Sequence, residues 1–212
     1  MTERNHETPE SKRMSLHLDQ ADPEIADALH DEIRRQAPGC QVEVLVPDFQ
    51  GNEEAIRLVV EARPEIFDHN TESVPRLYRA VRSGARYERT LRLLQLAKEI
   101  NPGTVTKSGV MVGLGEEMHE LLAVFRDLAS VGVNVLTIGQ YLRPSKDHLP
   151  IARYYTPEEV AFMKREALAM GFRHVESGPL VRSSYHAHEQ SDAQANSQAS
   201  PSATNSAYLP IM

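Results

Sequence analysis

Apolar positions along this chain switch repeatedly between two periods. Short runs rich in β-branched residues, such as Val42 to Val46, predict strands. Between these runs, apolar residues recur at helical spacing, as at Ile25, Leu29 and Ile33. Strands are predicted at 42–46, 66–69, 108–112, 133–138 and 172–175, and helices at 22–39, 52–62, 87–100, 116–131 and from 156 onward. Strands that alternate with long helices pair in parallel through right-handed crossovers, so the predicted fold class is α/β.

Two of the predicted helices carry clear end signals. Asp22 can cap a helix whose first position is Pro23, and Gly39 lies just beyond its end. Thr156 and Glu159 have the spacing of a capping box, in which each side chain bonds the backbone N–H of the other residue. The helix start at Thr156 is therefore the best-defined boundary in the sequence.

The two ends of the chain differ from the alternating core. Residues 1–20 are polar and aperiodic, and residues 191–206 are rich in Ser, Ala, Gln and Asn. Such segments bury too little apolar surface to offset the entropy of ordering. We expect one domain over 21–190, with disordered tails at 1–20 and 191–212.

Composition limits the partners and the compartment. The chain has 212 residues, a formal net charge of −7 and 41% hydrophobic residues. The negative charge gives no support for a nucleic acid or an anionic membrane as the main partner. The longest apolar runs, such as Val131 to Ile138, are far shorter than the roughly 18–20 residues that span a membrane. Because residues 1–20 contain no apolar leader core, a soluble cytoplasmic protein is expected.

Cysteine content restricts the sites that this sequence can build. Cys40 is the single cysteine, which excludes an intramolecular disulfide. It also excludes a zinc or iron–sulfur site made from several thiolates of this chain alone. Cys40 follows Gly39 and is interpreted as a loop residue between a helix and a strand.

Polar residues follow each of the first four predicted strands. In parallel β/α folds, ligands bind at the carboxyl ends of the strands, so these residues are candidates for a polar small-molecule site. They are Asp48 after the first strand, His69, Asn70 and Glu72 after the second, 113–116 after the third, and Gln140, Tyr141 and Arg143 after the fourth.

Other candidate motifs are weaker. Gly113-Leu114-Gly115 before a helix could present backbone N–H groups to a phosphate or carboxylate, but Met118 occupies the position where a dinucleotide fingerprint needs glycine. His186 and His188 could bind a metal, although without nearby partners they are more readily interpreted as exposed histidines. The chain contains no self-sufficient catalytic motif.

Five consecutive blocks resemble the lipoyl synthase family, in the family's order, over about residues 40–190. The most specific strings are IGQYLRPS and VRSSYHA, which exceed what a shared barrel fold would require. The blocks are VEVLVPDFQGNEEA (42–55), DHNTESVPRLYRAVR (68–82), TKSGVMVGLGE (106–116), LTIGQYLRPSKDHLPIARYYTPEE (136–159) and GFRHVESGPLVRSSYHAHEQ (171–190).

The resemblance implies a partial (β/α) barrel of the radical S-adenosylmethionine type, here missing its first strands. Lipoyl synthases bind two 4Fe–4S clusters and S-adenosylmethionine. One cluster, on a CxxxCxxC loop, cleaves S-adenosylmethionine to a radical. The other, held by a CxxxxCxxxxxC motif and a serine, is the sulfur donor. The family inserts sulfur at C6 and C8 of an octanoyl group carried on a lysine of a carrier protein or of a dehydrogenase E2 domain.

The resemblance also implies roles for individual residues. Ser183 or Ser184 would be the serine ligand of the sulfur-donating cluster, supported by Arg182. A serine oxygen is a weaker iron ligand than a thiolate, which suits a cluster that must release sulfide. Residues of the matching blocks that would line the cofactor cavity are Asn70, Glu72, Lys107 and Ser108, with Gln140, Tyr141 and Arg143 on the same rim.

The departures from the family pattern leave three hypotheses. Neither cysteine motif occurs, and a missing strand would leave the sheet edge at 42–46 unpaired. The chain could be part of a lipoyl synthase completed by a polypeptide that carries the cysteines, or an inactive truncated product. It could also be a non-catalytic module that binds an octanoylated or lipoylated carrier domain. The intact RSSY string favours the first hypothesis over the third, because a binding module needs no cluster ligand.

Overall fold

The computed structural model describes residues 35–36 and 40–181. One parallel sheet organises this part of the chain, with its strands adjacent in sequence order. The strands are β1 (Glu43–Leu45), β2 (Ile66–Asp68), β3 (Val105–Val112), β4 (Val135–Gln140) and β5 (His174–Gly178). The predicted α/β class is confirmed.

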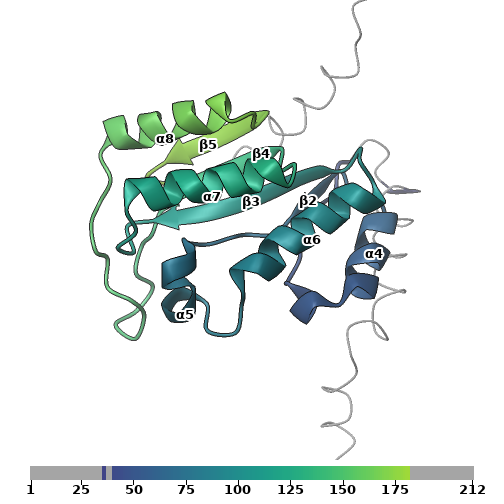
Figure 1. Cartoon of the computed structure of the whole chain (residues 1–212), viewed down its shortest axis with the longest axis horizontal. Coiled ribbons are helices and arrows are strands. Elements are labelled where there is room, and N and C mark those ends of the chain that lie inside the picture. The colour runs from purple at the N-terminus through teal and green to yellow at the C-terminus, as the bar shows by residue number, and fades with distance from the viewer. Residues whose placement is uncertain (1–34, 37–39, 182–212) are drawn as a thin grey trace, which may run out of the picture.

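The longer helices lie along one face of this sheet, as Figure 1 shows for α4, α6, α7 and α8. The helices are α4 (Glu53–Glu61), α5 (Tyr78–Val81), α6 (Tyr87–Ile100), α7 (Met118–Ser130) and α8 (Pro157–Ala169), and the 3₁₀ turns are η1 (Phe49–Gly51) and η2 (Pro75–Leu77). A doubly wound sheet would carry helices on both faces and would reverse its strand order. Sequential strands with helices on one side are instead a segment of a (β/α) barrel.

The two faces of the sheet carry different side chains because successive strand residues point to opposite sides. On the helix side, Phe67 and Leu136 join a large apolar core with the buried faces of the helices. The opposite face has a small separate apolar cluster of Ile66, Val105 and Val135. The remainder of that face is free to carry polar groups.

The helix boundaries follow local capping chemistry. At α8, the Thr156 hydroxyl accepts the Glu159 N–H at 3.3 Å and the Thr156 N–H donates to the Glu159 carboxylate at 2.9 Å, so the predicted capping box is confirmed. The helix predicted from Glu116 begins instead at Met118, with Glu117 as its cap. Glu116 is unavailable for the helix start because its carboxylate bonds the preceding glycine turn.

Strand ends are the least predictable boundaries. β3 begins at Val105 rather than Ser108, because the polar pair Thr106 and Lys107 is buried within the sheet. β4 and β5 each start and end later than predicted. The expected helix at 22–39 lies outside the described residues except for 35 and 36, which are helical, and both expected tails lie outside them entirely.

β1 forms one edge of the sheet. It pairs in parallel with β2, and within 35–36 and 40–181 no strand pairs with its other side. Leu45 on this edge keeps 59% of its surface exposed. Across the same ranges, no helix is long and apolar enough to cross a membrane.

Candidate functional site

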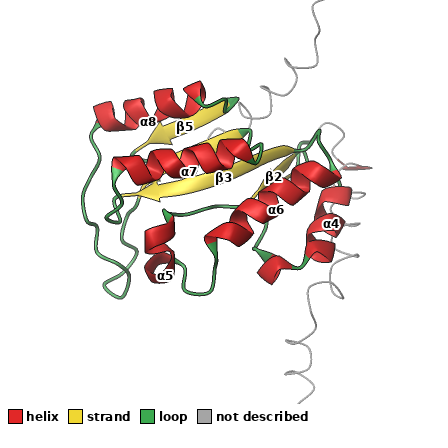
Figure 2. Ribbon diagram, in the orientation of Figure 1, coloured by secondary structure: helices red, strands yellow, loops and turns green. Residues whose placement is uncertain are grey.

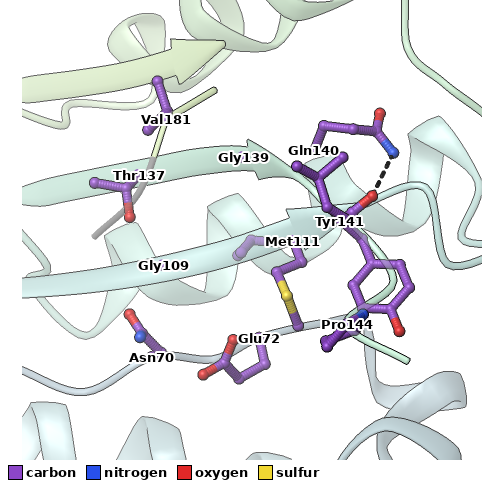
Figure 3. A pocket seen from close by; sticks show the side chains of 12 residues that line it. Asn70, Glu72, Gly109, Met111, Thr137, Gly139, Gln140, Tyr141, Pro144 and Val181 are labelled. Carbon is purple, nitrogen blue, oxygen red and sulfur yellow. Dashed lines mark hydrogen bonds between the residues drawn. The ribbon is translucent and has the colours of Figure 1, made fainter. Parts of the chain in front are cut away.

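A cavity of about 250 Å³ opens where β3 and β4 end and where the chain runs on from β2. Figure 3 shows its lining converging from these three segments. The lining residues are Asn70, Glu72, Gly109, Val110, Met111, Thr137, Gly139, Gln140, Tyr141, Leu142, Pro144 and Val181. Four of the residues predicted to contact a cofactor are therefore brought together: Asn70, Glu72, Gln140 and Tyr141.

Asn70 lies against β3 because residue 109 is glycine. A Cβ at Gly109 would come within 2.5 Å of the Asn70 side-chain oxygen and 2.9 Å of the Thr137 hydroxyl. The backbone carbonyl of Asn70 accepts from Arg82 at 2.7 Å, whereas its buried side-chain oxygen has no hydrogen-bond partner among the described residues. That oxygen is an acceptor available to a ligand.

Glu72 is held in an unusual backbone conformation. Its φ of 69° is in the left-handed region, which non-glycine residues seldom adopt and which is often found at functional sites. Two hydrogen bonds enforce it, from Glu72 N–H to the Gly109 carbonyl and from Met111 N–H to the Glu72 carbonyl, both 2.8 Å. Burial raises the pKa of the Glu72 carboxyl, although the Arg82 charge and the Asn70 amide oppose that increase.

Gln140 ties the end of β4 to the loop before α8. Its amide nitrogen donates to the Arg153 carbonyl at 3.1 Å, and its amide oxygen accepts from the Tyr155 N–H at 3.1 Å. Gly113 makes this approach possible, since a Cβ there would lie 2.1 Å from the Gln140 nitrogen. The Gln140 amide thus supports the pocket wall.

The glycine turn after β3 is closed by Glu116 rather than left open for an anion. The two Glu116 carboxylate oxygens accept the N–H groups of Gly113 at 2.6 Å and Leu114 at 2.8 Å. Because a carboxylate of the chain already occupies these donors, the turn provides no phosphate site in this conformation.

Tyr141 and Arg143 begin the loop that follows β4. The Tyr141 hydroxyl donates to the Leu149 carbonyl at 3.0 Å, while its ring contributes to the pocket. Arg143 does not line the cavity; its guanidinium donates to the carbonyls of Lys146 and His148 in the same loop. Arg143 therefore shapes the loop beside the pocket.

Lys107 lies below the cavity instead of on its wall. Its side chain has no solvent exposure and donates to a Glu43 carboxylate oxygen at 2.7 Å. Neither carboxylate oxygen of the neighbouring Asp68 has a hydrogen-bond donor among the described residues. Burial raises the pKa of Asp68 to about 8 against the effect of the Lys107 ammonium, and the Glu43 carboxylate adds to the increase. Glu43, Asp68 and Lys107 form a buried triad across β1, β2 and β3.

Ser108 and His69 both point into the scaffold. The Ser108 hydroxyl donates to the His69 carbonyl at 2.9 Å and lies 2.8 Å from the Thr71 hydroxyl. The His69 ring bonds the Val46 carbonyl at 2.8 Å and the Thr90 hydroxyl at 3.1 Å, and burial lowers its pKa. These groups hold the segment that presents Asn70 and Glu72.

Asp48 lies in a second, shallower hollow beyond β1. One of its oxygens caps the Gln50 N–H at 3.0 Å and the other pairs with Arg89 at 2.9 Å. Both carboxylate oxygens of Asp48 are thus used within the chain, and this residue does not reach the main pocket.

The described residues do not offer an iron–sulfur ligand set. Over 35–36 and 40–181, no three His, Cys, Asp or Glu side chains are grouped closely enough to hold a metal ion, and Cys40 is exposed. Arg182, Ser183, Ser184 and the pair His186 and His188 lie outside the described residues.

Several pocket residues were not predicted from the sequence. Gly109 and Gly139 have no side chain and create space, and Met111 and Val181 contribute apolar surface. A glycine inside a strand often marks a close approach of another chain segment, so TKSGV carried a usable signal. No comparable signal marks Val181, which reaches the pocket only through the tertiary fold.

Comparisons with known proteins agree with these features. A family model described as the radical SAM superfamily matches residues 13–128. The lipoyl synthase of Koribacter versatilis (strain Ellin345) is 74% identical over 163 residues, 77% of this chain and 54% of that protein. The lipoyl synthase of Rubrobacter xylanophilus is 62% identical over 160 residues, 76% of this chain and 50% of that protein. The chain spans about half the length of the curated relatives that it matches.

Proposed function

Because this chain belongs to the radical SAM superfamily and, within it, to the lipoyl synthase family, we propose that it forms the substrate side of a lipoyl synthase. The proposed reaction is sulfur insertion at C6 and C8 of a protein-bound octanoyl group. The observation that carries the proposal is the cavity at which Asn70 and Glu72, from one family block, meet Gln140, from another.

The polar side of the cavity suits S-adenosylmethionine. This ligand carries a sulfonium and an ammonium. Burial disfavours the ionised form of Glu72, and a nearby cation would stabilise that form. The free acceptor on Asn70 can receive a hydrogen bond from the ligand. One electron from a reduced 4Fe–4S cluster would cleave bound S-adenosylmethionine to methionine and a carbon-centred radical. The chain's own residues would bind the ligand and orient it.

The apolar side of the cavity suits an acyl chain. Met111, Leu142 and Val181 line it. Burying these surfaces against methylene groups is favourable by about 0.8 kcal/mol for each CH₂ removed from water. The proposed second substrate is therefore an octanoyl group on a carrier protein or a dehydrogenase E2 domain.

The clusters depend on sequence that these 212 residues do not contain. The chain has one cysteine, whereas each 4Fe–4S cluster needs several thiolates. We therefore propose no cluster held by the described residues alone. The expected contribution of this chain is Ser183 or Ser184 as the oxygen ligand of one cluster, supported by Arg182. A complementing polypeptide with both cysteine motifs would provide the remaining ligands.

A second candidate function is a non-catalytic module for an octanoylated or lipoylated carrier domain. The observation that favours it is the apolar cavity wall, which needs no cluster in order to accept an acyl chain. The two candidates differ in whether a redox cofactor is bound.

Anaerobic reconstitution distinguishes these candidates. The purified chain is treated with iron and sulfide, alone and mixed with a polypeptide bearing both cysteine motifs, and bound iron is counted. The lipoyl synthase proposal predicts that the mixture binds more iron than its two parts measured separately, and that Ser183→Ala or Ser184→Ala lowers the excess. An iron content equal to the sum of the parts, unaffected by the serine substitutions, would favour the binding module.

A further inference from the structure

The connection between β4 and α8 is a long exposed loop fixed to the pocket rim. Figure 2 shows it as an extended loop at the end of the sheet toward which the strand arrows point. The Ala152 N–H donates to the Gly113 carbonyl at 2.8 Å, and Gln140 bonds both Arg153 and Tyr155. The segment 142–154 is therefore a shaped surface held at both ends, which we refer to as the rim loop.

The rim loop is positively charged on a chain whose formal charge is −7. It carries Arg143, Lys146 and Arg153 against one acid, Asp147. The Arg143 guanidinium bonds only backbone carbonyls within the described residues, and the Lys146 ammonium has no partner there. Arg153 is paired with Glu159 at 2.7 Å. Two cations of the loop are thus left without a carboxylate.

Two large apolar side chains accompany these cations. Tyr154 is 66% exposed and Leu142 is 44% exposed. Leu142 and the neighbouring Pro144 also line the cavity, so the loop surface continues into the pocket mouth. An exposed tyrosine near an arginine is typical of protein interfaces, in which both residue types are enriched.

We propose that the rim loop is the docking surface for an acidic protein domain that presents an acylated lysine to the cavity. This inference rests on the proposed function, since it assigns a binding surface to that function's carrier substrate. Lys146 and Arg143 attract the domain, and Tyr154 and Leu142 hold it while the acyl chain enters beside Pro144. A nucleic acid is a poorer occupant, because the remainder of the chain is net negative and would repel a long polyanion.

The test uses the full chain and a small acidic lipoyl-type domain carrying one octanoyl-lysine. Association and dissociation rates are measured at low and high salt, for the wild type, Lys146→Glu and Tyr154→Ala. Arg126→Glu is the matched control, since Arg126 is exposed on α7, away from the rim loop. A short octanoyl-lysine peptide without acidic residues is the second probe.

The proposal predicts that Lys146→Glu slows association of the domain about threefold to tenfold at low salt, with a smaller effect at high salt. Tyr154→Ala is expected to speed dissociation, and Arg126→Glu to behave as wild type. Binding of the peptide should be unaffected by Lys146→Glu. The proposal would be overturned if Lys146→Glu and Arg126→Glu changed the association rate of the domain equally, or if neither changed it. It would also be overturned if a single-stranded oligonucleotide displaced the domain from the wild type but not from Lys146→Glu.

The peptide also separates this inference from the proposed function. In one outcome, the chain mixed with the cysteine-bearing polypeptide makes lipoyl product on the peptide, and the Lys146→Glu and Tyr154→Ala variants bind the domain as the wild type does. In that case the docking surface is wrong and the proposed function stands. If no product forms on either probe but the domain still binds in a Lys146-dependent and salt-dependent manner, the docking surface stands and the catalytic proposal fails.

Discussion

The ammonium of Lys107 lies 2.7 Å from a carboxylate oxygen of Glu43, on a lysine side chain with no solvent exposure. This contact joins β3 to β1 across β2, where Asp68 lies beside both groups. With Asp68 protonated, one cation and one anion remain, and the Asp68 proton can bond the Glu43 carboxylate. The floor beneath the cavity is thus an electrically balanced buried triad.

Breaking this pair is expected to destabilise the fold. Lys107→Met removes the ammonium and leaves Glu43 facing a buried surface, at a cost of about 3 kcal/mol, the lower end for a buried pair because Glu43 is partly exposed. The double variant Glu43→Gln, Lys107→Met should recover part of that loss. Urea unfolding gives the free energy of unfolding of the single and the double variant, and so measures both the loss and its recovery. Lys164→Met serves as the control, because Lys164 on α8 is partly exposed and its ion pair with Glu176 is long, at 3.9 Å. If Lys107→Met is as stable as Lys164→Met, the buried pair does not stabilise the fold.

The buried triad also predicts a pH dependence of stability. Asp68 has a pKa of about 8 in the fold, against 3.8 as its ordinary value, so between these two values the folded state binds more protons than the unfolded chain. The contribution of Asp68 is complete below about pH 4 and is lost as the pH rises toward about 8. Asp68→Asn should flatten the decline in unfolding free energy between about pH 5 and pH 8. An unchanged decline would show that Asp68 is already ionised in the fold.

Gly109 is expected to be required for ligand binding more than for folding. Gly109→Ala places a Cβ 2.5 Å from the Asn70 side-chain oxygen, so the Asn70 amide must move out of its place in the cavity. S-adenosylmethionine binding by the complemented protein should weaken by about tenfold, as expected for the loss of a hydrogen bond worth roughly 1.4 kcal/mol. Gly84→Ala is the control, since no atom lies within 4 Å of its added Cβ. Equal affinity in the two variants would remove Asn70 from the binding site.

Glu116 is expected to hold the glycine turn that supports the pocket wall. In Glu116→Gln, the amide oxygen can accept only one of the two N–H groups of Gly113 and Leu114, and the amide NH₂ faces the other N–H group. The unpaired donor should lower the free energy of unfolding by about 1–3 kcal/mol. The melting temperature of the chain measures this loss. Glu158→Gln, on the exposed first turn of α8, is the control and should leave the melting temperature unchanged. If Glu116→Gln has the same melting temperature as the wild type, Glu116 does not stabilise the turn.

Local patterns predicted the scaffold better than the floor of the site. The order of strands and helices follows from apolar periodicity, and the start of α8 follows from Thr156 and Glu159, which are close in sequence. Glu43 and Lys107 are 64 residues apart, so no local pattern could show that they pair. The family resemblance implies that Lys107 lines the cofactor cavity, whereas in the structure its side chain has no solvent exposure and pairs with Glu43.

The same distinction applies to the polar residues after the strands. Asn70, Glu72, Gln140 and Tyr141 reach the cavity, but Ser108 on β3 turns its hydroxyl toward Thr71. Alternation along a strand decides which face a residue occupies, and the boundaries of β3 had to be known before that face could be assigned. The assignment of Lys107 and Ser108 to cofactor binding stays a prediction.

Lipoyl formation on an octanoyl-lysine peptide is the most direct test of whether this chain forms the substrate side of a lipoyl synthase. The chain is mixed with a polypeptide bearing both cysteine motifs, reconstituted without oxygen and supplied with S-adenosylmethionine and a reductant, and the product is measured by mass spectrometry. Lipoyl peptide should form in the mixture but with neither part alone. The yield should fall strongly for Glu72→Gln and Gly109→Ala and stay normal for Gly84→Ala. The proposed function would be contradicted if the mixture bound iron but made no lipoyl peptide, or if Glu72→Gln and Gly109→Ala left the yield unchanged.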